Sequence, residues 1–226
     1  MMLPFGDILK KYNIKPTGII HCGAHYCEEH DDYVSYGISK FVYIEPCKSA
    51  LKVIYDKFHD ETALGFIQPH GVMGCEFRNK SIILMHCACG SKEGTMTMYA
   101  SENNQGQSNS LLEPNLHLQQ HPEVVFDSKE EVRVTLLDKL PIDKGAYNIL
   151  SMDVQGYEGE VLKGAIQTLQ HIDVIYTEVN NGDTYRGCML VDEMDEFLFD
   201  YQRVETYFPS PNWTWGDAVY IRKTLL

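Results

Sequence analysis

Apolar segments with the length of strands alternate with segments of helical character along most of the chain. The predicted strands are residues 17–22, 41–45, 81–87, 147–154, 173–179, 203–208 and 217–222. The predicted helices are residues 28–36, 49–58, 159–170 and 190–201, and the last two carry apolar stripes that place Ile166 and Leu190 inward. This alternation predicts an α/β fold with a mostly parallel sheet covered on both faces by helices. No helix separates the last two strands, which indicates an antiparallel edge.

The segment from about residue 91 to residue 140 interrupts the alternation. It contains a hairpin-like stretch at 95–99, a polar loop at 101–110 and a region rich in His and Gln at 111–121. Long segments of this kind inside a compact domain are usually functional or disordered. Because the sequence shows no repeat and no linker, we expect a single domain over residues 1–226, with a substrate-side insertion at about 91–140.

The charge balance disfavours functions that depend on a basic surface. The 226 residues are 44% hydrophobic and include 19 Lys and Arg against 32 Asp and Glu, which gives a formal net charge of −13. Proteins that bind nucleic acids or anionic membranes need basic surface, so we expect no nucleic-acid partner. The longest uncharged apolar segment, residues 81–91, is far shorter than the ~20 residues of a membrane span. Asp7 interrupts the apolar residues at the N-terminus, which disfavours a signal peptide.

The seven cysteines are an odd number and form no CxxC motif. A disulfide framework is typical of shorter, secreted chains with an even number of cysteines. We therefore predict reduced thiols that behave as small core residues, in a cytoplasmic protein.

The ends of the predicted strands hold the candidates for chemistry, because ligands of open parallel sheets bind beyond the carboxyl ends of the strands. These positions are Gly23, Ala24, His25, Glu45, Cys87, Ala88, Asp153, Glu178 and Asn180. Carboxylates at strand ends are better candidates than the same residues on a solvated helix.

The turn after the first predicted strand is similar to a nucleotide-binding turn. Gly23 and Ala24 allow a ligand to approach the backbone, and the start of the next helix is expected to offer free N–H groups to a carboxylate or phosphate. Glu45 follows Gly23 by 22 residues, a distance at which a carboxylate accepts both hydroxyls of a ribose. The alternative is an ordinary strand–helix turn with a surface Glu. A dehydrogenase is disfavoured, because His25 and Glu28 occupy two glycine positions of the G-x-G-x-x-G motif.

Six motifs occur in order along the chain: IIHCGAHYCEE, FVYIEP, SLLEP, VTLLDKL, ILSMDVQGYEGEVLKGA and IYTEV. Together they resemble the FkbM-type family of S-adenosylmethionine-dependent O-methyltransferases, and the similarity extends from about residue 17 to residue 221. The resemblance implies a Rossmann-like, seven-stranded class I methyltransferase fold whose last strand is inserted antiparallel. It also implies S-adenosylmethionine as the methyl donor, and a hydroxyl of a sugar, glycan or similar small molecule as the acceptor.

The resemblance also implies a set of cofactor-binding residues. These are His21, Gly23, Ala24, His25, Glu45, Pro46, Cys87, Ala88 and Asp153. Glu45 corresponds to the family's ribose carboxylate, and the end of the third predicted strand corresponds to the adenine edge. At His21, His25 and Cys27 the chain departs from the family's frequent Asp, Asn and Gly. The alternative function is therefore a non-catalytic Rossmann-like binding module that has lost methyl transfer.

Asp153 and Glu178 are the predicted catalytic residues. Methyl transfer to a hydroxyl requires alignment of donor and acceptor, and removal of the hydroxyl proton assists the attacking oxygen. Asp153 is the expected base or orienting group, with a pKa raised by burial beside other acids. With Asn180, the two carboxylates also resemble the ligand set of metal-dependent catechol-type O-methyltransferases, for which Mg²⁺ is suited. A structural network of hydrogen-bonded acids is the other interpretation of these residues.

Two further groups of residues are candidates for contact with the acceptor. His117 and His121 are four residues apart in a helix-like segment that lacks the HExxH motif, so we expect a solvated or substrate-facing pair. Residues 105–109 and 213–215 combine amides with aromatic rings and are suited to a sugar-binding wall. The alternative for these two segments is a flexible loop tip and a plug at a sheet edge.

Overall fold

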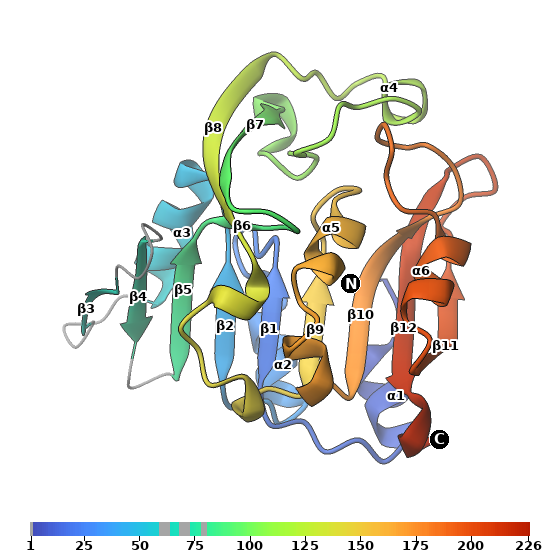
Figure 1. Ribbon diagram of the computed structural model, residues 1–226. Helices are drawn as coiled ribbons and strands as arrows, with labels where there is room; N and C mark the ends of the chain where they lie inside the picture. Colours follow the sequence, from blue (N-terminus) through green and yellow to red (C-terminus); the bar gives the residue numbers. More distant parts are fainter. Residues whose placement is uncertain (1, 59–63, 68–72, 78–80) are drawn as a thin grey trace.

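The computed structural model of the protein describes residues 2–58, 64–67, 73–77 and 81–226. One nine-stranded sheet runs through this part of the chain, and helices lie on both of its faces (Figure 1). The strand order is β11-β12-β10-β9-β1-β2-β5-β4-β3. The strands are β1 (Ile19–Cys22), β2 (Phe41–Ile44), β3 (Leu64–Ile67), β4 (Met73–Phe77), β5 (Ile82–His86), β9 (Ile149–Met152), β10 (Val174–Asn180), β11 (Tyr201–Tyr207) and β12 (Trp215–Arg222).

Seven of the nine strands are those predicted from the sequence. The strands β10, β9, β1, β2 and β5 pair in parallel. The last strand, β12, lies between β10 and β11 and is antiparallel to both. This arrangement confirms the predicted seven-stranded, mostly parallel sheet with an antiparallel last strand. The strands β3 and β4 extend the opposite edge in antiparallel pairing, and the sequence pattern did not predict them.

Alternate residues of the central strands enter two hydrophobic cores, one on each face of the sheet. In β1, Ile20 belongs to the core shared with α5 and α6, whereas Ile19 belongs to the core shared with α1, α2 and α3. Burial on both faces explains why the central strands are almost entirely apolar. The helices are α1 (Phe5–Lys11), α2 (His30–Ser35), α3 (Lys48–Phe58), α4 (His117–Gln120), α5 (Glu158–Lys163) and α6 (Val191–Phe197).

Two predicted helices are shorter than expected. The helix predicted over residues 159–170 ends at Lys163, and Ile166, which was expected to face inward, is 53% exposed. The cause is Gly164, where the chain passes so close to the preceding segment that a Cβ would lie 2.0 Å from the carbonyl oxygen of Gly90. The helix predicted over residues 190–201 ends at Phe197 because the chain turns into β11, and Leu190 before it is exposed.

The segment predicted as an insertion forms a second sheet and a short helix above the carboxyl ends of the parallel strands (Figure 1). Its strands are β6 (Ala88–Cys89), β7 (Gly94–Ala100) and β8 (Ser128–Thr135), in the order β6-β8-β7. The polar loop 101–110 joins the end of β7 to the region that contains α4. This second layer covers the site described below.

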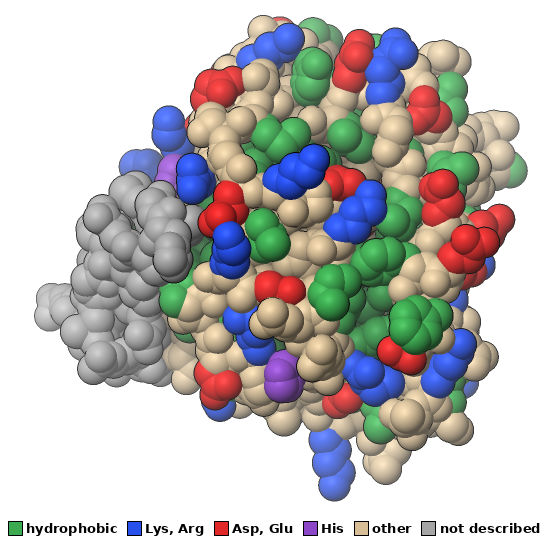
Figure 2. Space-filling view, viewed as in Figure 1, with side chains coloured by type: hydrophobic (Ala, Val, Ile, Leu, Met, Phe, Trp, Pro, Cys, Tyr) green, Lys and Arg blue, Asp and Glu red, His purple; other side chains and the backbone are tan. Residues whose placement is uncertain are grey.

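The cysteines, the helix lengths and the surface charges can be compared with the expectations from the sequence. The side chains of six cysteines are described; none of these six forms a disulfide and five are buried, whereas the Cys75 side chain lies outside the described part. Among the described residues, no helix is both long enough and apolar enough to span a bilayer. On the face that carries α5 and α6, Lys and Arg side chains are dispersed among Asp and Glu (Figure 2). The expected lack of a nucleic-acid partner stays a prediction.

Candidate active site

A cavity of about 640 Å³ opens at the carboxyl ends of β1, β2, β9 and β10, beneath the loop 101–110 and α4. It is lined by all the residues predicted to bind cofactor, and by both predicted catalytic residues. Asn180, the third metal candidate, is buried and does not line it. The rule that ligands bind beyond strand ends therefore identified residues that share one space.

The turn after β1 is built around Gly23. Its φ of +77° favours glycine, and a Cβ at this position would lie 1.8 Å from the carbonyl oxygen of Asp153. The N–H groups of Gly23 and Ala24 both donate to the carbonyl oxygen of Ile44, at 2.9 and 3.1 Å. The turn therefore pairs with the end of β2. The free N–H groups were expected at the start of the next helix, α2, which begins only at His30.

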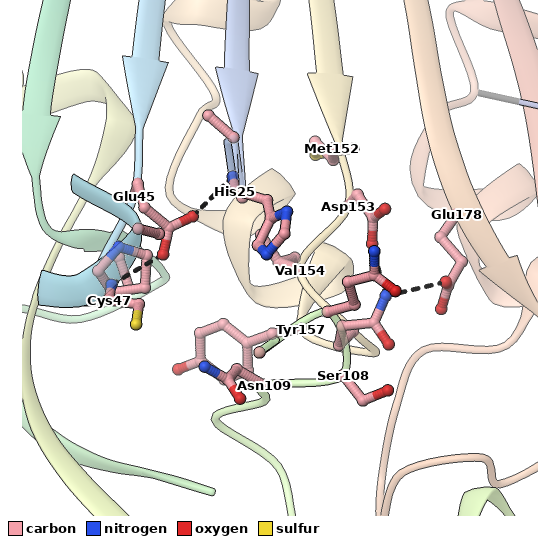
Figure 3. Close-up of a pocket in the computed structure, with 18 of the residues that line it drawn as sticks. His25, Glu45, Cys47, Ser108, Asn109, Met152, Asp153, Val154, Tyr157 and Glu178 are labelled. Atoms are coloured by element: carbon pink, nitrogen blue, oxygen red, sulfur yellow. Dashed lines mark hydrogen bonds between the residues drawn. The ribbon is translucent and has the colours of Figure 1, made fainter. Parts of the chain in front are cut away.

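Glu45, at the end of β2, is a buried carboxylate with two backbone partners. Oε2 accepts the N–H of His25 at 2.9 Å, and Oε1 accepts the N–H of Cys47 at 2.8 Å (Figure 3). Burial raises the pKa of Glu45 to about 7, although the two backbone hydrogen bonds act to lower it. A carboxylate accepts up to four hydrogen bonds, so Glu45 keeps acceptor capacity toward the cavity.

The two histidines of the first turn have different environments. His25 contacts Glu28 through Nδ1 at 2.7 Å and the carbonyl oxygen of Gln105 through Nε2 at 2.9 Å, so it connects the turn to the polar loop 101–110. Burial lowers the pKa of His25, but these two hydrogen bonds outweigh that effect and raise it overall. His21 is buried against Tyr33, and burial lowers its pKa, so it is a neutral side chain in the core beneath the cavity.

The end of β5 forms a small, apolar part of the cavity. Cys87 and Ala88 are buried there, and Cys89 follows in β6. The hydrogen bond with Cys89, together with burial, raises the pKa of the Cys87 thiol, so it stays protonated. Pro46 lines the cavity between this region and Glu45, and its carbonyl oxygen lies 3.2 Å from Nε2 of His86.

Asp153 and Glu178 are held by one glutamine. Nε2 of Gln155 donates to Oδ1 of Asp153 at 2.6 Å and to Oε2 of Glu178 at 3.3 Å, and its Oε1 accepts the hydroxyl of Tyr185 at 2.8 Å (Figure 3). The Asp153 carboxyl is open to the cavity and enclosed by protein on its other sides, whereas Glu178 is only 6% exposed. The geometry makes Asp153 the accessible member of the pair.

The pKa values of this group are raised. Burial raises the pKa of Asp153, and the charge of Asp217 raises it further, whereas the Gln155 hydrogen bond lowers it. Burial also raises the pKa of Glu178 well above its ordinary value, with further contributions from the charges of Asp153 and Glu158. Glu178 therefore holds a proton more firmly than Asp153, and Asp153 is the better base of the two.

The remaining acids of the cluster have structural partners. Glu158 accepts the backbone N–H groups of Val154 and Gly156, at 2.9 and 3.4 Å. Asp217 accepts the Tyr176 hydroxyl. The described residues contain no group of three or more His, Cys, Asp or Glu side chains placed to hold a metal ion. The arrangement of Asp153 and Glu178 around an amide fits the hydrogen-bonded network that the sequence left open.

Gln155 and Tyr185 were not predicted to belong to the site. Gln155 has a φ of +54°, which turns its side chain back between the strand ends. The Gln-Gly pair after Asp153 is a turn signal that could have indicated this geometry. Tyr185 comes from a distant loop, and only the tertiary fold shows that it lines the cavity.

His117, His121 and Trp215 form an aromatic wall of the cavity. His117 is 4% exposed, so the solvated alternative is wrong for this residue, and its Nε2 lies 3.1 Å from Oγ of Ser108. Burial and then the charge of His121 lower the pKa of His117 to about 4, so its ring is neutral. Trp215 donates its indole N–H to Nε2 of His121 at 3.0 Å. Residues 105–109 line the same cavity.

The strand order, the inserted antiparallel strand and the cavity at the parallel strand ends together define a Rossmann-like fold of the methyltransferase type. The sequence pattern of the Methyltransferase FkbM domain matches residues 21–205. The chain therefore belongs to the FkbM methyltransferase family.

Two known proteins show how far the similarity extends. The chain is 31% identical over 121 residues to 2-O-methyltransferase NoeI of Sinorhizobium fredii (strain NBRC 101917 / NGR234), a region that covers 53% of this chain and 48% of NoeI. The crystal structure of Methyltransferase FkbM from Methylobacillus flagellatus KT superposes with a TM-score of 0.55 at 16% identity, covering 91% of this chain and 43% of that chain. The second similarity shows the fold alone. The chain spans about half the length of the curated relative that it matches.

Proposed function

We propose that the protein is an S-adenosylmethionine-dependent O-methyltransferase that transfers a methyl group to a hydroxyl of a sugar, a glycan or a similar small molecule. The observation that carries the proposal is the placement of Glu45 and Asp153, two acids with different surroundings, in one cavity at the strand ends. The similarity to NoeI, a 2-O-methyltransferase, supports a hydroxyl as the acceptor.

The donor would lie along the ends of β1, β2 and β5. Glu45 is fixed by two backbone N–H groups and retains acceptor capacity for the two hydroxyls of a ribose. The small buried surface of Cys87 and Ala88 suits the adenine ring, and Pro46 lies between these two regions. His21, Gly23, Ala24 and His25 surround the space beside Asp153, so they are the proposed contacts near the methionine end. When bound, the donor supplies an electrophilic methyl group on a sulfonium.

Asp153 receives the proton of the acceptor hydroxyl in this proposal. Its accessible carboxyl faces the cavity. Its pKa is raised toward neutral pH, which makes it a more effective proton acceptor than an ordinary aspartate. The Gln155 amide orients the Asp153 carboxyl, and Tyr185 orients the amide. Glu178 completes the catalytic pair by holding the other side of the Gln155 amide. The second sheet and the loop 101–110 would be a substrate-side insertion, because residues 104–109 line the cavity.

The first test is calorimetric titration with S-adenosylhomocysteine. We expect one-to-one binding to the wild type, loss of binding in Glu45→Ala, and retained binding without methyl transfer in Asp153→Asn. Each titration and each transfer assay is repeated with Mg²⁺ and with EDTA, because Asp153, Glu178 and Asn180 carry oxygen atoms of the kind that Mg²⁺ binds. Unchanged turnover in Asp153→Asn would remove Asp153 from the role of base.

The non-catalytic alternative predicts a different result. It is favoured by the turn after β1, whose N–H groups are already used within the protein. A binding module would bind S-adenosylhomocysteine and transfer no methyl group to any acceptor. We further propose a cytoplasmic location, which the buried thiols of Cys22, Cys27 and Cys87 support.

A further inference from the structure

The ionisable side chains that line the cavity are mostly acidic. Seven carboxylic acids line it: Glu28, Glu29, Glu45, Glu123, Asp153, Glu178 and Asp217. Within the described lining there is no Lys or Arg side chain. The His partners of two of these acids, His25 and His121, lie at the rim together with Glu28 and Glu123. The seven acids outnumber the two histidines that pair with them, so an anionic ligand in this cavity would meet an excess of acidic side chains.

Three of these acids, Asp153, Glu178 and Asp217, come from the residue after β9 and from β10 and β12, on the acceptor side of the proposed site. Glu178 and Asp217 are directly opposite each other on β10 and β12, so their side chains lie on the same face of the sheet. The next pair on that face is Asn180 with Trp215. Residues two apart on a strand are separated by roughly 7 Å, so a ring that contacts Trp215 also reaches the acids.

Trp215 presents a fixed aromatic surface to this space. Trp213 stacks on it with a centroid distance of 5.2 Å and an interplanar angle of 12°. The indole N–H of Trp215 is already used by His121, so its remaining face offers apolar contact rather than a hydrogen bond. The apolar face of a sugar ring is suited to such a surface.

Two buried polar atoms of the cavity lack a partner among the described residues. They are Oε1 of Glu178 and Nδ1 of His117, and both residues line the cavity. Leaving a buried polar atom unpaired is unfavourable, so a ligand that completes these bonds is favoured. A hydroxyl both donates and accepts, and it satisfies either atom in either protonation state or tautomer.

We propose that this part of the cavity accepts a sugar ring that is neutral or carries an ammonium group, and that it rejects sugars bearing a phosphate or carboxylate. The inference rests on the proposed function, since it names the acceptor of the same site. Sugars linked to a nucleotide or a phosphate are anionic. The reaction that supplies the acceptor is therefore a glycosyl transfer or a phosphate removal, and methylation follows it.

Tryptophan fluorescence gives a readout that is independent of methyl transfer, because the chain has two tryptophans: Trp215 lines the cavity and Trp213 stacks on it. The probes are matched sets of hexose, hexosamine, uronic acid and hexose 6-phosphate in the gluco, galacto and manno series. The change in emission gives the affinity for each sugar. Transfer of a labelled methyl group from S-adenosylmethionine gives the kcat/KM for each sugar as acceptor. We expect the neutral and ammonium members to be preferred over their anionic counterparts by about 100-fold.

Two variants separate local from overall charge. Glu123→Gln removes a carboxylate from the cavity. We expect it to reduce the ratio of neutral-sugar to anionic-sugar affinity several-fold. Glu196→Gln removes the same charge from the exposed surface of α6, away from the lining, and we expect it to leave the preference unchanged.

Equal or better use of anionic sugars by the wild type would overturn the proposal. So would binding of S-adenosylhomocysteine by a protein whose tryptophan emission responds to no sugar of any charge. Failure of the proposed function is recognised separately, as the lack of calorimetric binding of S-adenosylhomocysteine. In that case the fluorescence titration still decides whether the wall discriminates by charge.

Discussion

Affinity for S-adenosylhomocysteine is expected to fall about tenfold between pH 8 and pH 6. The cause lies in Glu45, whose pKa burial raises to about 7. Its carboxylate form accepts the N–H groups of His25 and Cys47 and can accept two ribose hydroxyls as well. Protonation converts one acceptor oxygen into a donor, so the ionised form is the one that binds.

The size of the effect follows from this pKa. At pH 8 almost all of Glu45 is ionised, at pH 7 about half, and at pH 6 roughly a tenth. The fall from pH 7 to pH 6 is about fivefold, which corresponds to about 1 kcal/mol of binding free energy. A glutamate with an ordinary pKa of ~4.3 would stay ionised over this whole range and give a flat profile. Ligand binding stabilises the carboxylate and therefore releases a proton below pH 7.

The assay is calorimetric titration from pH 6 to pH 8 with the wild type, Glu45→Gln and Asp153→Asn. We expect the pH slope in the wild type and in Asp153→Asn, since Asp153 belongs to the acceptor side of the cavity. Glu45→Gln should bind weakly at every pH and without a slope. A flat wild-type profile, or a slope that persists in Glu45→Gln, would refute the role given to Glu45.

Three further predictions concern stability and catalysis. Gly164→Ala should destabilise the fold by about 1–3 kcal/mol in chemical denaturation, because its Cβ would lie 2.0 Å from the Gly90 carbonyl oxygen, whereas Gly145→Ala, with no atom closer than 3.5 Å, should have little effect. The empty protein should lose thermal stability as the pH rises from about 4.5 toward 7, because the folded state keeps a proton on Glu45 that the unfolded chain has released; Glu45→Gln should show a shallower slope. Tyr185→Phe should lower kcat in the transfer assay and leave S-adenosylhomocysteine affinity unchanged, because it removes the hydroxyl that orients the bridging amide; equal losses in both would contradict that role.

The fold was largely predictable because burial on both faces makes the central strands apolar over their whole length. The antiparallel last strand followed from the lack of a helix before it. The extent of the helices was less predictable. After α5, the helical spacing of apolar residues continues past Gly164, but the helical conformation of the backbone ends before it. That boundary depends on a close approach to Gly90, a contact between segments far apart in sequence.

The site was predictable where a residue type stands at a strand end, as for Glu45 and Asp153. It was not predictable where the local backbone geometry or a distant loop determines which groups meet in the cavity. The N–H groups of Gly23 and Ala24 are paired with Ile44, because the turn continues the hydrogen bonding of the neighbouring strand. Gln155 reaches both acids only through its positive φ, which the sequence indicates weakly.

The most direct test of the account is transfer of a carbon-13-labelled methyl group from S-adenosylmethionine to the panel of sugars, followed by NMR of the products. The account predicts a new methyl signal bonded to a sugar oxygen, equal amounts of S-adenosylhomocysteine, neutral or ammonium-bearing acceptors, and no product with Asp153→Asn. A methyl group on nitrogen, a product that forms equally well with Asp153→Asn, or no transfer by a protein that binds S-adenosylhomocysteine would contradict it.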